Sequence, residues 1–354
     1  MKREPAIGKE LIVIVVAVVA VIGLAQVTPA SGGDAIRRTR TGEPDLTGVY
    51  DISSLTPFER PTNYGDRVSL TEEEAIAIEK SQSEAVAARA KASDPEREPP
   101  AKGGDVGAYN DFWFEWGTRG FAIDGQYRTS ILIDPPNGRM PAMTAAAKER
   151  LAKGPRFDWG KNTGTAWWME TGEGPYDDPE FNVLGVRCIY QPPATIPMRP
   201  LPYNNLKTIV QTEDYVTILV EWMHWARIIR LDSEHLPAEM RSLGGDSIGW
   251  WEGDTLVVET TNFLESPGVP KDGLRILEYF SPVDTDTLLY KFTVNDPDYE
   301  APYTGELVWP RTEQRSYEYA CHEGNYAMGN TLRGARLLEQ EWLKEKQAAS
   351  TDHR

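Results

Sequence analysis

Eight short segments rich in β-branched and aromatic residues follow one another in the second half of the chain, and turn residues separate several of them. They lie near residues 206–212, 215–223, 225–231, 247–251, 254–262, 274–281, 286–294 and 304–319. Clear turn signals are Glu213-Asp214, Glu252-Gly253-Asp254 and Asp284-Thr285-Asp286. Side chains of these types fit half-buried pleated surfaces, and short connections pair neighbouring strands antiparallel. The pattern predicts a mainly β fold, an antiparallel meander that forms a barrel or a sandwich.

The segments before residue 206 predict peripheral helices and further strands. Thr71 precedes three glutamates, and the apolar residues after them approximate one stripe, which predicts a helical strap near residues 69–92. Further candidates are strands at 46–50, 110–117 and 128–133, a short helix at 144–151 and a long loop system at 153–205. The predicted domains are therefore a linker at 31–45, one β-rich domain at 46–330 and a charged helical tail at 331–354.

The first thirty residues are typical of a secretory signal. Basic residues come first, an apolar run from Leu11 to Ala25 follows, and small residues surround Pro29. The run is shorter than the roughly 20 residues that span a bilayer comfortably, which favours a cleaved signal peptide at residues 1–30. The alternative is an N-terminal anchor formed by residues 11–27. In either case we expect a secreted or periplasmic protein that contacts a membrane only through this segment.

The charge balance excludes one class of partner. The chain has 54 acidic and 37 basic residues, a formal net charge of −17, so a phosphate backbone would be repelled. No nucleic-acid partner is expected, and the sequence does not set the oligomeric state.

The two cysteines, Cys188 and Cys321, lie beyond the leader in a chain bound for an oxidising space. One disulfide is the expected outcome there. The alternative is a catalytic thiol at Cys321 with the adjacent His322 as its base, but neighbouring side chains in a strand point to opposite faces.

Five blocks of the chain resemble those of a large family of secreted bacterial proteins that has no assigned activity. They are Phe58-Glu59-Arg60-Pro61, Leu70-Thr71-Glu72-Glu73-Glu74-Ala75, Tyr109-Asn110-Asp111-Phe112-Trp113, the stretch from Arg128 to Pro136 and the stretch from Ser247 to Thr261. The resemblance spans about residues 46–325. It implies a Cys188–Cys321 bridge, since members have cysteine at both positions. It also implies that Asp246 stands where relatives have histidine.

Gly48-Val49-Tyr50 is similar to the G-x-W opening of lipocalin-like proteins, with Tyr50 in the tryptophan position. This second resemblance implies that the meander closes into a lipocalin-like barrel.

Strand alternation across residues 218–231 places His224 and Trp222 on one face, and Glu221, Trp225 and Arg227 on the other. An imidazole between tryptophans suggests a polar group in an aromatic-lined cavity, or else a satisfied interior histidine. We take His224, Glu221 and Arg227 as candidate catalytic residues. The candidate ligand-binding residues are Trp222, Trp225, Trp250 and Tyr290, whose alternative role is ordinary core packing.

His224, His235 and Asp246 are a weaker candidate set for a metal, because their spacing matches no established motif. No cofactor is expected, since the chain lacks a Walker loop, a G-x-G-x-x-G turn after a strand, a C-x-x-C pair and H-E-x-x-H.

The function expected from these residues is an exported β-barrel that binds a small, largely apolar or aromatic molecule. A cofactor-free enzyme is the first alternative, an isomerase, hydratase or hydrolase that uses His224, a cavity carboxylate such as Glu221 and an anion-stabilising Arg227 or Arg128. The second alternative is a structural cell-envelope protein, which predicts an exposed aromatic patch.

Overall fold

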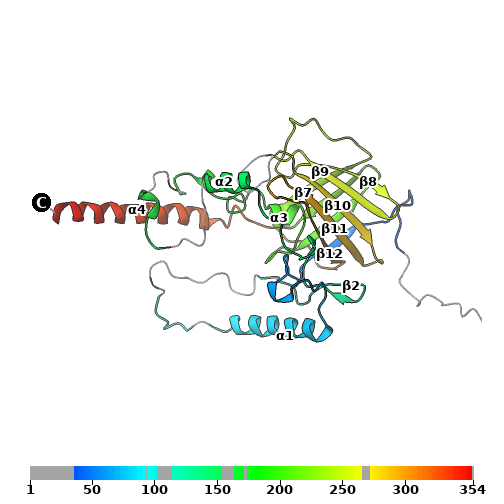
Figure 1. Ribbon diagram of the computed structural model, residues 1–354, viewed down its shortest axis with the longest axis horizontal. Coiled ribbons are helices and arrows are strands. Elements are labelled where there is room, and N and C mark those ends of the chain that lie inside the picture. Colours follow the sequence, from blue (N-terminus) through cyan, green and yellow to red (C-terminus); the bar gives the residue numbers. More distant parts are fainter. Residues whose placement is uncertain are drawn as a thin grey trace, which may run out of the picture. The chain divides into compact units, whose positions relative to one another are not determined.

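Strands rich in β-branched and aromatic residues pair into one curled sheet that forms a half-barrel (Figure 1). The computed structural model describes residues 36–92, 94–99, 101, 114–153, 163–170, 174, 176–264 and 272–352. Within these residues the sheet has ten strands in the order β1-β5-β6-β7-β8-β9-β10-β11-β12-β4. The fold is mainly β, as the sequence predicts. The predicted leader and the Tyr109–Trp113 block lie outside the described residues.

The strands of the half-barrel are β1 (Gly48–Asp51), β4 (Leu132–Asp134), β5 (Leu206–Gln211), β6 (Tyr215–Val220), β7 (Trp225–Leu231), β8 (Asp246–Glu252), β9 (Thr255–Thr261), β10 (Arg275–Pro282), β11 (Thr287–Asn295) and β12 (Tyr303–Pro310). A second sheet pairs β2 (Ala122–Ile123) with β3 (Gln126–Tyr127). The eight strands predicted after residue 206 are confirmed as β5 to β12. The last one differs in length, since it ends at Pro310 rather than near residue 319.

One pairing differs from the predicted meander, because β7 and β8 run parallel. A parallel pair needs a connection that crosses back along the sheet, and residues 232–245 supply it. The other strand pairs of the half-barrel are antiparallel.

The G-x-aromatic opening joins the first strand of the chain to the end of β12. Tyr50 forms a bridge with Arg311, and the N–H of Thr312 donates to the carbonyl of Val49 at 2.8 Å. The guanidinium of Arg311 lies 4.9 Å from the centroid of the Tyr50 ring. A Cβ at Gly48 would lie 1.7 Å from the Arg311 guanidinium, so no larger residue fits while Arg311 packs there.

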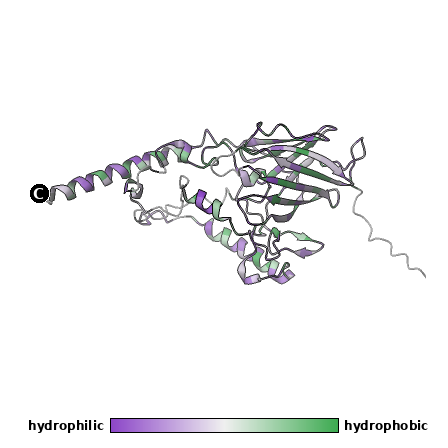
Figure 2. Ribbon diagram, turned by 45° about the horizontal axis from the view of Figure 1, so that its top comes forward, coloured by the Kyte–Doolittle hydropathy of each residue, from purple (hydrophilic) through white to green (hydrophobic). Residues whose placement is uncertain are grey.

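The concave side of the sheet is filled by its own side chains. Figure 2 shows strands of the sheet with long hydrophobic stretches. Alternate residues of β10 to β12 point inward, and the largest of these are Phe280, Tyr290, Phe292 and Trp309, each fully buried. Ring centroids of Tyr290 and Trp309 are 4.8 Å apart. The described interior is therefore a packed core.

The helices are α1 (Glu72–Arg89), α2 (Ala145–Lys153), α3 (Pro192–Thr195) and α4 (Tyr326–Asp352), with 3₁₀ turns at Thr62–Tyr64, Trp167–Glu170, Pro179–Phe181 and Trp222–His224. The strap predicted near residues 69–92 is α1. Its N-terminus is a capping box in which Thr71 accepts from the N–H of Glu74 and Glu74 accepts from the N–H of Thr71.

The C-terminal helix begins before residue 331, the predicted start of the tail. It packs through Ala335, Leu338 and Trp342 against a separate small cluster around Trp168. The predicted strand at 110–117 is not found in its described part, because Phe114–Gly117 lies outside the sheet.

Cys188 and Cys321 form a disulfide, as predicted, across 133 residues of chain. A disulfide indicates an oxidising environment. Among the residues that the structure describes, no helix is long and apolar enough to cross a membrane.

We expect removal of the disulfide to lower the free energy of unfolding by about 2–5 kcal/mol, because the bridge constrains a long loop of the unfolded chain. The change is Cys188→Ser with Cys321→Ser, measured by urea unfolding. Reduced wild-type protein is the matched control and should match the double variant. Equal stability of the oxidised wild type and the double variant would contradict this.

Candidate functional site

The corner between β6 and β7 carries the predicted catalytic histidine. Met223 and His224 adopt φ values of 58° and 49°, which end the strand in a tight turn. The expected alternation of faces is therefore interrupted here. His224 is exposed, rather than enclosed by aromatic rings as expected. Its Nε2 accepts from the N–H of Tyr319 at 3.0 Å and lies 3.1 Å from the carbonyl of Tyr317, so it holds that segment against the corner.

Glu221 and Trp222 also pack against their own chain. The carboxylate of Glu221 is buried and accepts from the N–H groups of Leu206 and Tyr317. Burial raises its pKa above the ordinary value. The ring of Trp222 stacks on Tyr203 with centroids 4.5 Å apart. The side chains of Glu221 and Trp222 are therefore packed against other residues of the protein at this corner.

Arg227 lies away from His224, inside the half-barrel, and pairs with Glu278. Both side chains are buried, and the guanidinium donates to both carboxylate oxygens. Two further N–H groups of Arg227 donate to the hydroxyls of Ser247 at 3.2 Å and Thr260 at 2.9 Å. Each buried charge is thus matched by a charge and by hydroxyl groups, as a buried pair requires.

Tyr290 completes this network. Its hydroxyl donates to Glu278 at 2.6 Å and accepts from the N–H of Met198 at 3.0 Å. Burial, together with the carboxylate, raises the pKa of the phenol well above its ordinary value. The predicted ligand-binding residue is therefore already engaged on both sides by the protein.

The two other predicted ligand-binding tryptophans lie on different parts of the sheet. Trp225 packs its ring against Tyr190 with centroids 4.6 Å apart. Trp250 is half-buried, and its indole N–H donates to Glu252 at 2.8 Å. The structure does not gather the four predicted residues around one space.

A buried lysine that the sequence analysis missed lies on β5. Lys207 is 1% exposed and sits between Tyr50 and Val220, its register partners on β1 and β6. Burial lowers the pKa of its ammonium to about 8. The alternation of β5 alone could have placed it inward, on the same face as Ile209.

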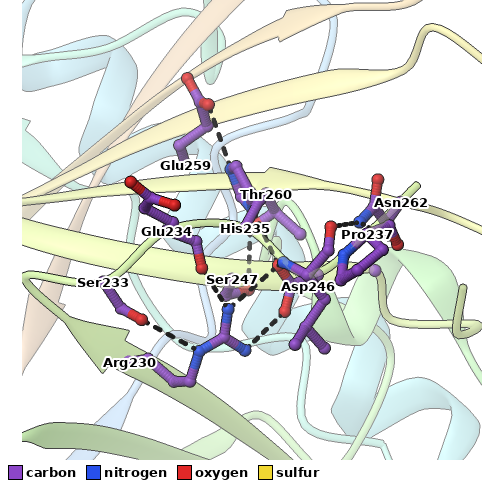
Figure 3. Close-up of polar contacts among 12 residues, drawn as sticks. Arg230, Ser233, Glu234, His235, Pro237, Asp246, Ser247, Glu259, Thr260 and Asn262 are labelled. Carbon is purple, nitrogen blue, oxygen red and sulfur yellow. Dashed lines mark hydrogen bonds and ion pairs between the residues drawn. The ribbon is translucent and has the colours of Figure 1, made fainter. Parts of the chain in front are cut away.

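His235 and Asp246 meet beside β8, as the weaker metal hypothesis expected, but Glu259 takes the place of His224 (Figure 3). His235 lies between the two carboxylates, with Nδ1 2.8 Å from Asp246 and Nε2 3.1 Å from Glu259. Arg230 donates to both oxygens of Asp246 at 2.7 and 3.3 Å. No group of three His, Cys, Asp or Glu side chains in the described part of the chain is arranged to hold a metal ion.

This cluster fixes the crossover between β7 and β8. The N–H of Leu236 donates to Asp246 at 2.9 Å, and the side-chain amide of Asn262 donates to the carbonyl of Leu236 at 2.8 Å. Both ring nitrogens of His235 contact carboxylates, so the cluster serves as a clip that holds the crossover against the sheet.

A cavity within the described residues lies beside α1. It is a half-open cavity of about 230 Å³ with a mostly apolar lining. Its lining includes Ala75 and Ile78 of α1, and also Leu55, Pro57, Pro61, Tyr64, Leu70 and Tyr127. Thr56, Gly120, Arg128 and Thr129 complete it.

Hydrogen bonds hold Thr129, a lining residue outside α1, in place. Arg60 is 1% exposed, and it donates to the hydroxyl of Thr129 at 3.0 Å and to the carbonyl of Pro136 at 2.9 Å. The hydroxyl of Thr129 donates in turn to the carbonyl of Arg67 at 2.7 Å. The cavity is therefore formed by positioned groups before any ligand is present.

Comparison of the chain with protein-family models, with curated proteins and with solved structures finds no match.

We expect Arg227→Met to lower the free energy of unfolding by about 3–5 kcal/mol, because it leaves the Glu278 carboxylate buried without its cation. Urea unfolding measures the change. Adding Glu278→Leu should recover part of the loss. Arg40→Met, at an arginine whose side chain is 83% exposed, is the control and should cost less than about 1 kcal/mol. A change below about 1 kcal/mol for Arg227→Met would contradict the role of the pair.

The contacts of Asp246 in this cluster predict that the free energy of unfolding depends on pH. Burial alone would raise the pKa of Asp246, but the bonds from Arg230 and His235 outweigh it and lower that pKa. A lowered folded-state pKa adds stability that is complete above the unfolded value of about 3.9 and is lost as the pH falls towards the folded value.

Asp246→Asn should therefore lower the free energy of unfolding by about 2 kcal/mol at neutral pH, and the difference should shrink below about pH 4. Urea unfolding from pH 7 to pH 3 measures it. Glu234→Gln, an exposed carboxylate on the same crossover, is the control. A difference that stays constant over this range would argue against the clip.

Proposed function

We propose that this protein binds a small, largely apolar or aromatic molecule in the cavity beside α1. The observation that carries the proposal is a mostly apolar space of about 230 Å³ whose walls come from α1 and from segments distant in the chain. The site differs in place from the barrel interior expected at first, because aromatic rings and the Arg227–Glu278 pair occupy the interior.

The volume limits the ligand. A dry apolar cavity of roughly 150 Å³ accepts benzene, and drug-sized ligands occupy about 300–1,000 Å³. A space of about 230 Å³ therefore suits one ring with a short substituent. Such a ligand gains free energy by removing apolar surface from water.

Residues that border the cavity are held in place by hydrogen bonds. They therefore lose little conformational entropy when a ligand binds. Arg60 and Thr129 hold the loop side through buried hydrogen bonds. The capping box and the Arg67–Glu74 ion pair at 2.6 Å hold the start of α1. Preorganisation of this kind improves affinity by lowering the ordering cost.

The disulfide and the leader-like first thirty residues together support an exported protein, secreted or periplasmic. A binding protein in that compartment would meet its ligand outside the cytoplasm.

The structure gives less support to the two alternative functions, a cofactor-free enzyme and a structural cell-envelope protein. His224 contacts backbone atoms and is exposed, which offers no acid–base pair for a cofactor-free enzyme at that corner. Trp222 and Tyr203 stack on each other instead of forming the exposed patch that a structural envelope protein would need.

Ethylbenzene is a suitable probe, and we expect it to bind with a Kd below about 1 mM. Ile78→Trp fills the cavity and should weaken binding roughly tenfold or more. Ile76→Trp lies on the same helix at a position 55% exposed and should bind like the wild type. Ligand-observed NMR titration measures all three, with circular dichroism to check that each variant is folded.

Two results would contradict the proposal. One is the absence of saturable ethylbenzene binding by the wild type. The other is equal binding by the wild type and the folded Ile78→Trp variant.

A further inference from the structure

We propose that the occupant of the cavity beside α1 is a neutral aryl carbonyl compound, whose carbonyl oxygen accepts a hydrogen bond from the hydroxyl of Thr56. The inference rests on the proposed function, and it adds the chemical class of the ligand and the residue that recognises it.

Thr56 supplies an unused donor inside the cavity. Its side chain lines the cavity, and the residue is 5% exposed. Its oxygen accepts from the N–H of Phe121 at 3.2 Å. A hydroxyl also has one proton to donate, and the structure gives it no acceptor among the residues described. A buried donor without a partner costs free energy, which a ligand acceptor would recover.

Gly120 leaves the space next to that hydroxyl open. A Cβ at this position would lie 3.2 Å from the Thr56 hydroxyl oxygen and 4.0 Å from the Tyr127 ring. Any larger residue would occupy the place from which a ligand oxygen can approach Thr56. The donor and the room for its acceptor therefore occur together.

Flat groups border the rest of the site. Tyr64 and Tyr127 line it together with Pro57 and Pro61, and the Tyr127 ring lies 4.0 Å from the position of a Cβ at Gly120. Aromatic rings favour offset or edge contacts with another ring. These surfaces favour a planar ring beside the carbonyl group over a branched aliphatic chain.

The nearby charges favour a neutral ligand over a carboxylate. Arg128 lines the cavity, but its guanidinium lies 3.1 Å from Glu306, and both side chains are largely buried. Arg119 donates to the Tyr127 hydroxyl at 2.8 Å and pairs with Glu79. Because each of these cations has an acidic partner, a ligand carboxylate would meet an acidic side chain beside each arginine.

The test compares acetophenone with ethylbenzene, which has the same shape without the carbonyl oxygen. Wild type, Thr56→Val and Thr56→Ser are titrated with each compound by NMR, and the ratio of the two Kd values is taken for each protein. We expect Thr56→Val to shift the ratio against acetophenone by roughly three- to tenfold, the factor of one hydrogen bond. Thr56→Ser keeps the hydroxyl and should keep the wild-type ratio.

The ratio of the two Kd values distinguishes loss of the hydrogen bond to the carbonyl oxygen from a general weakening of the site. Loss of the Phe121 contact would weaken the binding of both compounds and would leave their ratio unchanged. An unchanged ratio in Thr56→Val, with ethylbenzene still bound, would overturn this inference and leave the proposed function standing. Tighter binding of benzoate than of acetophenone would overturn the neutral class. Failure of the wild type to bind either compound would overturn both proposals.

Discussion

The ion pair between Arg227 and Glu278 determines what the interior of the half-barrel contains. Two charges removed from water require matching donors and acceptors, and the hydroxyls of Ser247, Thr260 and Tyr290 provide them. Rings on β10 to β12 surround this network and fill the remaining volume. The curled sheet therefore has a solid interior. Space for a ligand is left outside it, where α1 lies against loops that Arg60 holds in place.

Much of the fold follows from local patterns. The strands after residue 206 could be placed because alternation and turn residues act over a few positions. The start of α1 could be placed because a capping box needs Thr71 and Glu74 alone. The disulfide could be predicted from two cysteines and a first segment that resembles a secretory signal. The strands, the start of α1 and the disulfide can each be predicted from a short stretch of sequence or from the composition.

The candidate site depends on contacts that no short stretch contains. Strand alternation predicts His224 on a continuous strand, but left-handed residues at 223 and 224 turn the chain there. The parallel pairing of β7 and β8 depends on the path of a crossover that His235 and Asp246 hold. The cavity combines α1 with residues near 56 and 120, although three of the five sequence blocks, those at Phe58–Pro61, Leu70–Ala75 and Arg128–Pro136, contribute to its lining and could have indicated it.

We propose that the ligand lies beside α1 and not within the half-barrel. A crystal structure of the full-length protein soaked with acetophenone tests it most directly. We expect electron density for the ring between Ile78 and Tyr127, with the carbonyl oxygen within about 3 Å of the Thr56 hydroxyl. Density inside the half-barrel next to Tyr290, with the cavity beside α1 unoccupied, would contradict it.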